Sequence, residues 1–186
     1  SGISLTANGK VYAVGTPDSH IKFKAPSSAQ FWNTIVVNNT SGTNTYQYCD
    51  FENGTNALDF HAASKNSISY CTFSNIVSYG VVFRESSINM VSYCTFQNGL
   101  YGIGMTAGAY IGVDINQTTK INNCSFSHCA SHAIWGEAHG NAGRYSGSNY
   151  YWIWGQSAWL NVDVTDCIFD SVGIGCLFYA YGEQWN

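Results

Sequence analysis

A three-residue motif, Cys-x-Phe, recurs at five positions with a shared sequence context and constrains the fold of this chain more than any other feature. The motifs begin at Cys49, Cys71, Cys94, Cys124 and Cys167, so successive spacings are 22, 23, 30 and 43 residues. The first two spacings indicate a structural unit of about 22 residues, and the longer ones indicate the same unit with loop insertions. Self-similarity at such a period is typical of a repeat protein.

Apolar residues recur at fixed offsets from each cysteine. One stands three positions before it, and another, usually aromatic, stands eleven or twelve positions after it. The intervening stretches are rich in Asn, Gly and Ser, which favour turns. Each unit is therefore predicted to be a strand, a corner, a second strand and another corner. Because one unit is too small to bury its own apolar side, stacked copies are expected to close a shared core.

Composition supports an all-β chain that forms a single domain over residues 1–186. Asn, Ser, Thr, Gly, Tyr and Val dominate, and no apolar stripe of helical period is sustained. The charge balance of 7 Lys+Arg against 11 Asp+Glu argues against a nucleic-acid partner. No apolar run reaches the roughly 18 residues that a membrane-spanning helix needs.

The repeat pattern, as in INNCSF followed by HAIW, resembles that of right-handed parallel β-helix proteins of the pectate-lyase-like and NosD-like secreted or surface families. The N-terminal third resembles the opening rungs of surface β-helix proteins. The resemblance implies a solenoid of about 6–7 rungs with insertions at about 106–118 and 136–159. An irregular β-sandwich is the alternative, although its strands would not keep a Cys-Phe register. Because β-helices carry lyases, hydrolases, epimerases, adhesins and inert scaffolds, the resemblance implies a fold and no function.

The five repeat cysteines occupy one inward position, which predicts a core ladder of buried thiols. Its members are Cys49, Cys71, Cys94, Cys124 and Cys167. Side chains in parallel register point the same way, which suits disulfide geometry badly, so we expect free thiols. Cys129 and Cys176 lie off the ladder and pair only if their loop and strand meet. No cysteine or histidine pair has zinc-ligand spacing, and Asp50, Glu52 and Asp59 support a calcium site only thinly, so neither a metal nor a cofactor is predicted.

Polar residues follow the second predicted strand of successive units and are candidate catalytic residues. They are His61, Arg84, Glu85, Glu137 and His139, with Thr106 in the same series. Stacking would bring them to one edge of the solenoid, within about one residue of register. A carboxylate there could act as general acid or base with a histidine assisting, and Arg84 could neutralise a substrate carboxylate. Charged strand ends are ordinarily solvated, however, so the sequence favours a noncatalytic protein.

Two groups of aromatic residues are candidate binding residues. Tyr48, Tyr70 and Tyr93 precede three of the cysteines, and the second predicted insertion contains Tyr151, Trp152 and Trp154. Exposed aromatic stripes bind sugars or another subunit, or they only stiffen a sheet by cross-strand stacking. The sequence leaves both interpretations open.

Five Asn-x-Ser/Thr sequons are a weak indication of glycosylation. They begin at Asn38, Asn39, Asn53, Asn116 and Asn123. Asn53 and Asn116 fall in predicted corners or insertions, so they are the favoured acceptors.

The two ends of a solenoid expose unpaired backbone and core, and neither end of this chain shows an obvious polar cap. Either copies stack head-to-tail as a homo-oligomer, or the chain is a fragment of a longer β-helix. The favoured function is an extracellular or cell-surface structural protein that self-assembles, such as a glycosylated filament subunit. The alternatives are a carbohydrate-active enzyme of lyase, hydrolase or epimerase type and a noncatalytic glycan-binding module.

Overall fold

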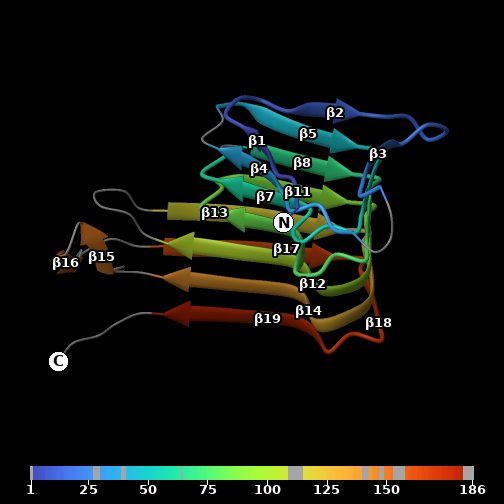
Figure 1. Cartoon of the computed structure of the whole chain (residues 1–186). Coiled ribbons are helices and arrows are strands. Elements are labelled where there is room, and N and C mark those ends of the chain that lie inside the picture. Colours follow the sequence, from blue (N-terminus) through green and yellow to red (C-terminus); the bar gives the residue numbers. More distant parts are fainter. Residues whose placement is uncertain are drawn as a thin grey trace.

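The computed structural model describes residues 2–26, 30–38, 41–63, 65–108, 115–139, 143–146, 149–152 and 158–181. All the elements named within these residues are strands. Figure 1 shows them stacked in coils, from the N-terminal coil around β2 to the C-terminal coil around β19. No helix in the described residues is long and apolar enough to cross a membrane.

Each coil contributes one strand to each of three faces, and the strands within a face are parallel. The first face is a six-stranded sheet of β2 (Tyr12–Val14), β5 (Thr43–Gln47), β8 (Lys65–Ser69), β11 (Ile88–Ser92), β13 (Ile115–Asn122) and β17 (Ala158–Thr165). The second face contains β3 (Ile21–Lys24), β6 (Cys49–Glu52), β9 (Thr72–Ser74), the first parts of β12 (Thr95–Gly108) and β14 (Ser125–His139), and β18 (Ile168–Asp170). The third face contains β1 (Leu5–Ala7), β4 (Ile35–Asn38), β7 (Leu58–His61), β10 (Tyr79–Arg84), the second parts of β12 and β14, and β19 (Ile174–Tyr181).

The prediction of two strands per unit is therefore wrong, because each coil has three. The segment that ends two residues before each cysteine is a strand of its own, and a single left-handed residue turns the chain from it toward the Cys-x-Phe strand. That corner residue has a positive φ of 51° to 54° in Tyr48, Tyr70, Tyr93, Asn123 and Asp166. A left-handed residue turns the chain sharply without a loop, so the spacing pattern did not reveal the corner.

The predicted insertions are narrower than expected. Residues 106–108 and 115–118 belong to β12 and β13, and residues 136–139 and 158–159 belong to β14 and β17. Between β14 and β17, β15 (Gly143–Ser146) and β16 (Asn149–Trp152) pair antiparallel. The strands of the coil thus extend into most of the first predicted insertion.

Stacked columns of identical or similar side chains fill the core. The phenylalanine column runs through every coil, with ring centroids 4.7 to 5.3 Å apart, and contains Phe23, Phe51, Phe73, Phe96, Phe126 and Phe169. A second inward column contains the repeat cysteines. In a third column, Asn44, Asn66 and Asn89 are buried and hydrogen-bond to one another through their side-chain amides. Because neighbouring coils are about 4.8 Å apart, each ring or amide inside a column has a like partner above and below.

Candidate functional site

The predicted edge exists as one outward column on the third face. Strand pairing aligns Asn38, His61, Arg84, Thr106, Glu137 and Tyr179. The column lies where the strands of this face end. The structure therefore brings His61, Arg84 and Glu137 to one edge, as their spacing predicted.

Asp59 joins two of these residues, although the sequence indicated it only as a thin candidate for a calcium site and not as part of this edge. Its Oδ1 accepts a hydrogen bond from Arg84 Nε at 2.9 Å and lies 2.9 Å from His61 Nε2. The Asp59 side chain is 10% exposed, whereas those of His61 and Arg84 are 44% and 38% exposed. Asp59 alternates with the inward Leu58 and Phe60, so it points outward beneath the two longer side chains. We call these three residues the Asp59 cluster.

The remaining edge candidates do not join the Asp59 cluster. Glu137 Oε2 lies 3.2 Å from His139 Nε2 on the same strand. Glu85 follows the column in a left-handed corner with φ 57°, and its carboxylate lies beside Gly108. Asp59 and Glu137 belong to strands three coils apart, which corresponds to about 14 Å. Glycosidase carboxylate pairs are about 5 to 9.5 Å apart, so these two carboxylates do not form such a pair.

Aromatic rings cover the outer side of the third face next to this edge. The rings of Tyr79 and Tyr101 are stacked with centroids 4.5 Å apart, and those of Tyr101 and His132 with centroids 5.7 Å apart. The Trp135 ring is tilted relative to the Tyr79 ring, and their centroids are 6.3 Å apart. The Tyr79 ring lies over Gly104, where a Cβ would come within 2.6 Å of it. Burial, aided by Tyr101, raises the pKa of the Tyr79 phenol. The outer face is thus packed with side chains.

The predicted tyrosine column forms, and its rings stack on one another. Centroids are 5.0 Å apart for Tyr48 and Tyr70 and 4.9 Å apart for Tyr70 and Tyr93. Since each ring covers its neighbour's face, most of the column offers edges and hydroxyls to a sugar, and no open ring faces. Tyr151 and Trp152 lie in β16, where only the backbone is described, and Trp154 lies outside the described residues.

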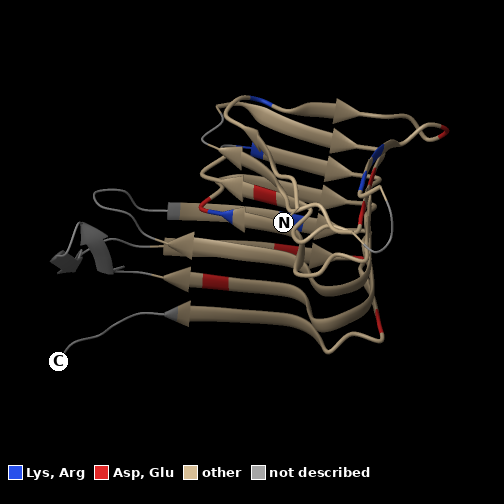
Figure 2. Cartoon of the chain, in the orientation of Figure 1, with Lys and Arg blue, Asp and Glu red and all other residues tan. Residues whose placement is uncertain are grey.

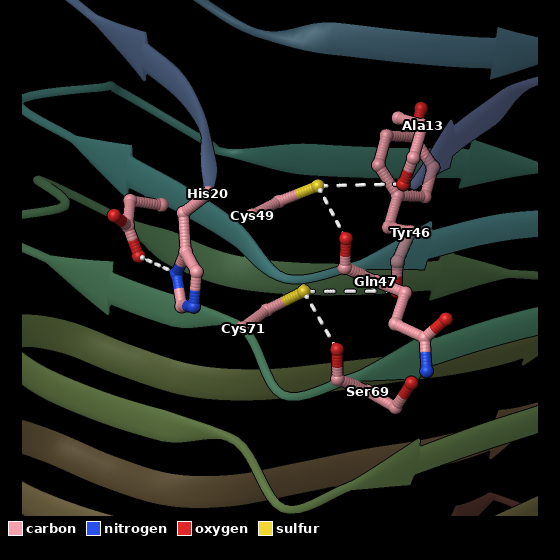
Figure 3. A network of polar contacts seen from close by, with 8 residues as sticks. Ala13, His20, Tyr46, Gln47, Cys49, Ser69 and Cys71 are labelled. Atoms are coloured by element: carbon pink, nitrogen blue, oxygen red, sulfur yellow. Dashed lines mark hydrogen bonds and ion pairs between the residues drawn. The ribbon is translucent and has the colours of Figure 1, made fainter. Parts of the chain in front are cut away.

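The cysteine ladder also forms, and all seven cysteines are free. Figure 3 shows Cys49 and Cys71 one above the other, each donating its thiol proton to a carbonyl oxygen two residues earlier, at 3.4 Å to Gln47 and 3.2 Å to Ser69. Cys124 is equally buried, whereas Cys167 in the last coil is half-buried. Burial raises the pKa of the Cys94 thiol, so this member at the middle of the ladder is a packed neutral group. No group of three or more potential metal ligands occurs in the described part of the chain.

The sequons differ in accessibility. Asn53 is only 6% exposed, which makes this favoured acceptor unreachable in the folded chain. Asn38 Nδ2 donates to Asn8 Oδ1 at 3.2 Å, and Asn116 Oδ1 accepts from Asn161 Nδ2 at 2.8 Å. Asn123 is exposed at a corner. Asn39 lies outside the described residues.

The first and last coils expose core positions that the middle coils bury. A cavity of about 940 Å³ opens at the first coil, lined by Leu5, Phe23, Phe31, Trp32 and Ile35 among others. In the last coil, Phe169, Ile174 and Phe178 are 37%, 44% and 43% exposed. Charges are few and scattered elsewhere on the molecule (Figure 2), but Lys22 and Lys24 lie on β3 and Asp170 on β18.

Residues 2–184 match the protein family described as a right-handed β-helix region. No curated protein and no solved structure matches the chain.

Proposed function

Because this chain belongs to the family of right-handed β-helix proteins, we propose that it is a structural subunit of an extracellular or cell-surface assembly, in which a second copy continues the coils head-to-tail. The fold serves many functions, so the proposal depends on the surfaces of this chain. The observation that carries it is the match between the exposed columns of the last coil and those of the first.

The phenylalanine column reaches both exposed coils. Phe169 stacks on Phe126 at 5.3 Å, and Phe23 stacks on Phe51 at 4.9 Å, while the other ring face of each terminal phenylalanine has no ring partner among the described residues. If β3 of a second copy paired in parallel with β18, its Phe23 would take the next position after Phe169. The column would then continue across the junction at the spacing of one coil.

Charge complementarity supports the same register. Strand pairing places Lys24 and Asp170 in one outward column, through Glu52, Ser74, Gln97 and Ser127. Continuation by a second copy would therefore set Asp170 beside the next copy's Lys24, with opposite charges in contact.

Size complementarity points the same way. In an inward column of the third face, Phe178 belongs to the last coil and Val37 of β4 to the first. In this register β4 of the second copy follows β19, so β1, which pairs with the outer edge of β4 in its own chain, must leave that position. In the first face, Val164 corresponds to Ala13. Stacking would thus place larger side chains of the last coil against smaller ones of the first, which avoids overpacking the new core. A contact of this kind uses two different surfaces and so propagates as a filament unless it closes.

Sedimentation and light scattering over a range of concentrations test this proposal. We expect concentration-dependent association of the wild-type chain, weakened several-fold by Asp170→Lys and recovered in the charge swap Asp170→Lys with Lys24→Asp. The swap is the matched control, since it keeps both altered side chains and restores opposite charges. A single monomeric species at all concentrations, with no fibres in electron micrographs, contradicts the proposal.

The Asp59 cluster favours a second candidate function, a carbohydrate-active enzyme. His61 Nε2 and Arg84 Nε each lie 2.9 Å from the same Asp59 oxygen, and a neutral ring that donates from Nε2 leaves Nδ1 as a proton acceptor. Such an arrangement can remove a proton beside a substrate carboxylate. Depolymerisation of an acidic polysaccharide that is lost in Asp59→Asn and His61→Gln variants supports this candidate, and absence of any turnover across a polysaccharide panel rejects it.

A further inference from the structure

The tyrosine column ends at Tyr93, and Asn123 occupies the next position of the same column. Ser92 pairs with Asn122, and the Tyr93 backbone N–H donates to the Asn122 carbonyl oxygen at 3.1 Å, so Asn123 is one coil beyond Tyr93. Both residues have left-handed backbone, with φ of 54° and 51°. The side chain of Asn123 thus leaves the coil where a fourth tyrosine ring would be.

A left-handed corner suits asparagine well and tyrosine poorly, because β-carbon sterics disfavour positive φ in most residues. The three tyrosines break this local preference, and stacking of their rings is the compensating interaction that the structure shows. Tyr93 is 52% exposed, more than the 40% of Tyr70. No ring of the described residues stacks on the face of Tyr93 that looks toward Asn123.

Asn123 differs from the other described sequon asparagines in the exposure and hydrogen bonding of its side-chain amide. It is exposed, and its side-chain amide makes no hydrogen bond with the described residues. By contrast, Asn53 is buried, and the amides of Asn38 and Asn116 are engaged by neighbouring asparagines. The remaining sequon residues are well placed, because Cys124 turns inward and Ser125 begins β14.

We propose that Asn123 is an N-glycosylation site and that its first sugar extends the tyrosine stack onto the free face of Tyr93. A pyranose on Nδ2 would lie at the level of the next ring, with the C–H groups of one sugar face against the electron-rich face of the phenol. The inference rests on the proposed extracellular function, since glycosylation requires export.

The modification is an ordinary transfer from a lipid-diphosphate-linked sugar. Asn123 Nδ2 attacks the anomeric carbon, the bond between that carbon and the diphosphate oxygen breaks, and the new N–C bond forms. The amide nitrogen gives up one of its two protons, and the lipid diphosphate is the leaving group.

The first part of the test is site occupancy. The chain is secreted from a eukaryotic cell that glycosylates sequons, and glycopeptides are mapped by mass spectrometry. We expect a glycan on Asn123 and none on Asn53, and we expect Asn123→Gln and Ser125→Ala each to remove it. An unmodified Asn123 beside an occupied Asn38 or Asn116 overturns the proposal.

The second part asks whether the sugar contacts Tyr93. Asn123→Gln is measured in the wild-type, Tyr93→Phe and Tyr93→Ser backgrounds by thermal unfolding. Loss of the glycan should lower the Tm by a few degrees in the first two backgrounds and by much less in Y93S. Equal shifts in all three overturn the stacking. The head-to-tail test can be run on unglycosylated protein made in bacteria, so failure of one proposal is distinguishable from failure of the other.

Discussion

The middle coils and the end coils carry the same motif in very different surroundings. Phe73 and Phe96 are 1% and 2% exposed, whereas Phe169, in the same column and after the same cysteine, is 37% exposed. The cysteines differ likewise, since Cys94 is buried and Cys167 is half-buried. The difference arises only from the neighbouring coil, which covers one side of a middle coil and leaves one side of an end coil open.

Burial in this fold is thus supplied by the adjacent coil and not by the local sequence. A residue has the same backbone and the same motif in both settings, yet its contribution to stability depends on what stacks above and below it. Substitutions at equivalent positions of a middle coil and an end coil test how much of the stability the adjacent coil supplies.

The largest expected effect is from truncation in the phenylalanine column. Phe73→Ala should destabilise the chain by about 3–5 kcal/mol, because it leaves a cavity between two stacked rings. Phe169→Ala should cost only about 1 kcal/mol in the dissociated monomer, because one face of the ring is open. Denaturant unfolding at low protein concentration checks both. Equal losses would show that the exposed coil is as well packed as the middle ones.

The next largest loss of stability is expected in a column of the third face that contains glycines. A Cβ on Gly102 would lie 2.5 Å from the Ala133 carbonyl oxygen, so Gly102→Ala should cost about 1–3 kcal/mol by overpacking. Gly175 lies further along this column in the last coil, and its nearest neighbour would be 3.9 Å away, so Gly175→Ala is the matched control and should be almost neutral. Thermal unfolding of the two variants measures the difference in their stability. An unchanged Tm for Gly102→Ala would contradict close packing at this position of β12.

A smaller loss of stability is expected at alkaline pH, through the buried thiol of Cys129. Burial raises the pKa of Cys129 from its ordinary value of 9.0 to about 11. The folded state therefore holds its proton more tightly than the unfolded state, and this stabilisation is complete below pH 9 and is lost between about pH 9 and pH 11. By pH 10 the loss should be about 1 kcal/mol. The free energy of unfolding of wild type and of Cys129→Ala, measured against pH, isolates the contribution of this thiol. The same pH dependence in both proteins would refute a raised pKa for Cys129.

The smallest effect concerns the Asp59 cluster. Asp59→Asn should cost at most about 1 kcal/mol, because the partners His61 and Arg84 are partly exposed and solvent screens them. Glu137→Gln, which alters the more exposed pair with His139, should cost less. Urea unfolding at low and high salt compares them. A loss several times larger for Asp59→Asn would mean that the cluster organises the third face.

Much of the fold was predictable because inward columns obey a strict register. Five Cys-x-Phe motifs determine the second face, and the residues eleven or twelve positions later determine the third in four of the five units. In the unit of Cys124 the prediction of Trp135 is wrong, because a register shift puts Gly136 in the inward column. The first face was not recognised as separate, since its corner is a single residue and its outward positions show no residue type that recurs in every coil. Tyr48 in a left-handed corner runs against the usual preference of tyrosine, so no local rule indicates it.

The site was predictable only in part. The shared edge of His61, Arg84 and Glu137 follows from counting residues along each coil. The role of Asp59 does not, because an outward residue between Leu58 and Phe60 looks like any solvated strand position. Its contact with Arg84 joins adjacent coils and depends on side-chain length and direction, which spacing does not specify.

Register-specific cross-linking tests head-to-tail continuation most directly. Strand pairing puts Ile21 of the first coil and Cys167 of the last coil in one inward column, and Ile21 takes the position after Cys167 when β3 of a second copy pairs with β18. We predict that a short thiol-reactive bifunctional reagent joins copies of an Ile21→Cys variant through Cys167 into dimers and longer chains, and that Lys22→Cys, one residue away and outward, remains uncross-linked. Equal cross-linking of the two variants, or none in either, would contradict continuation of the coil by a second copy.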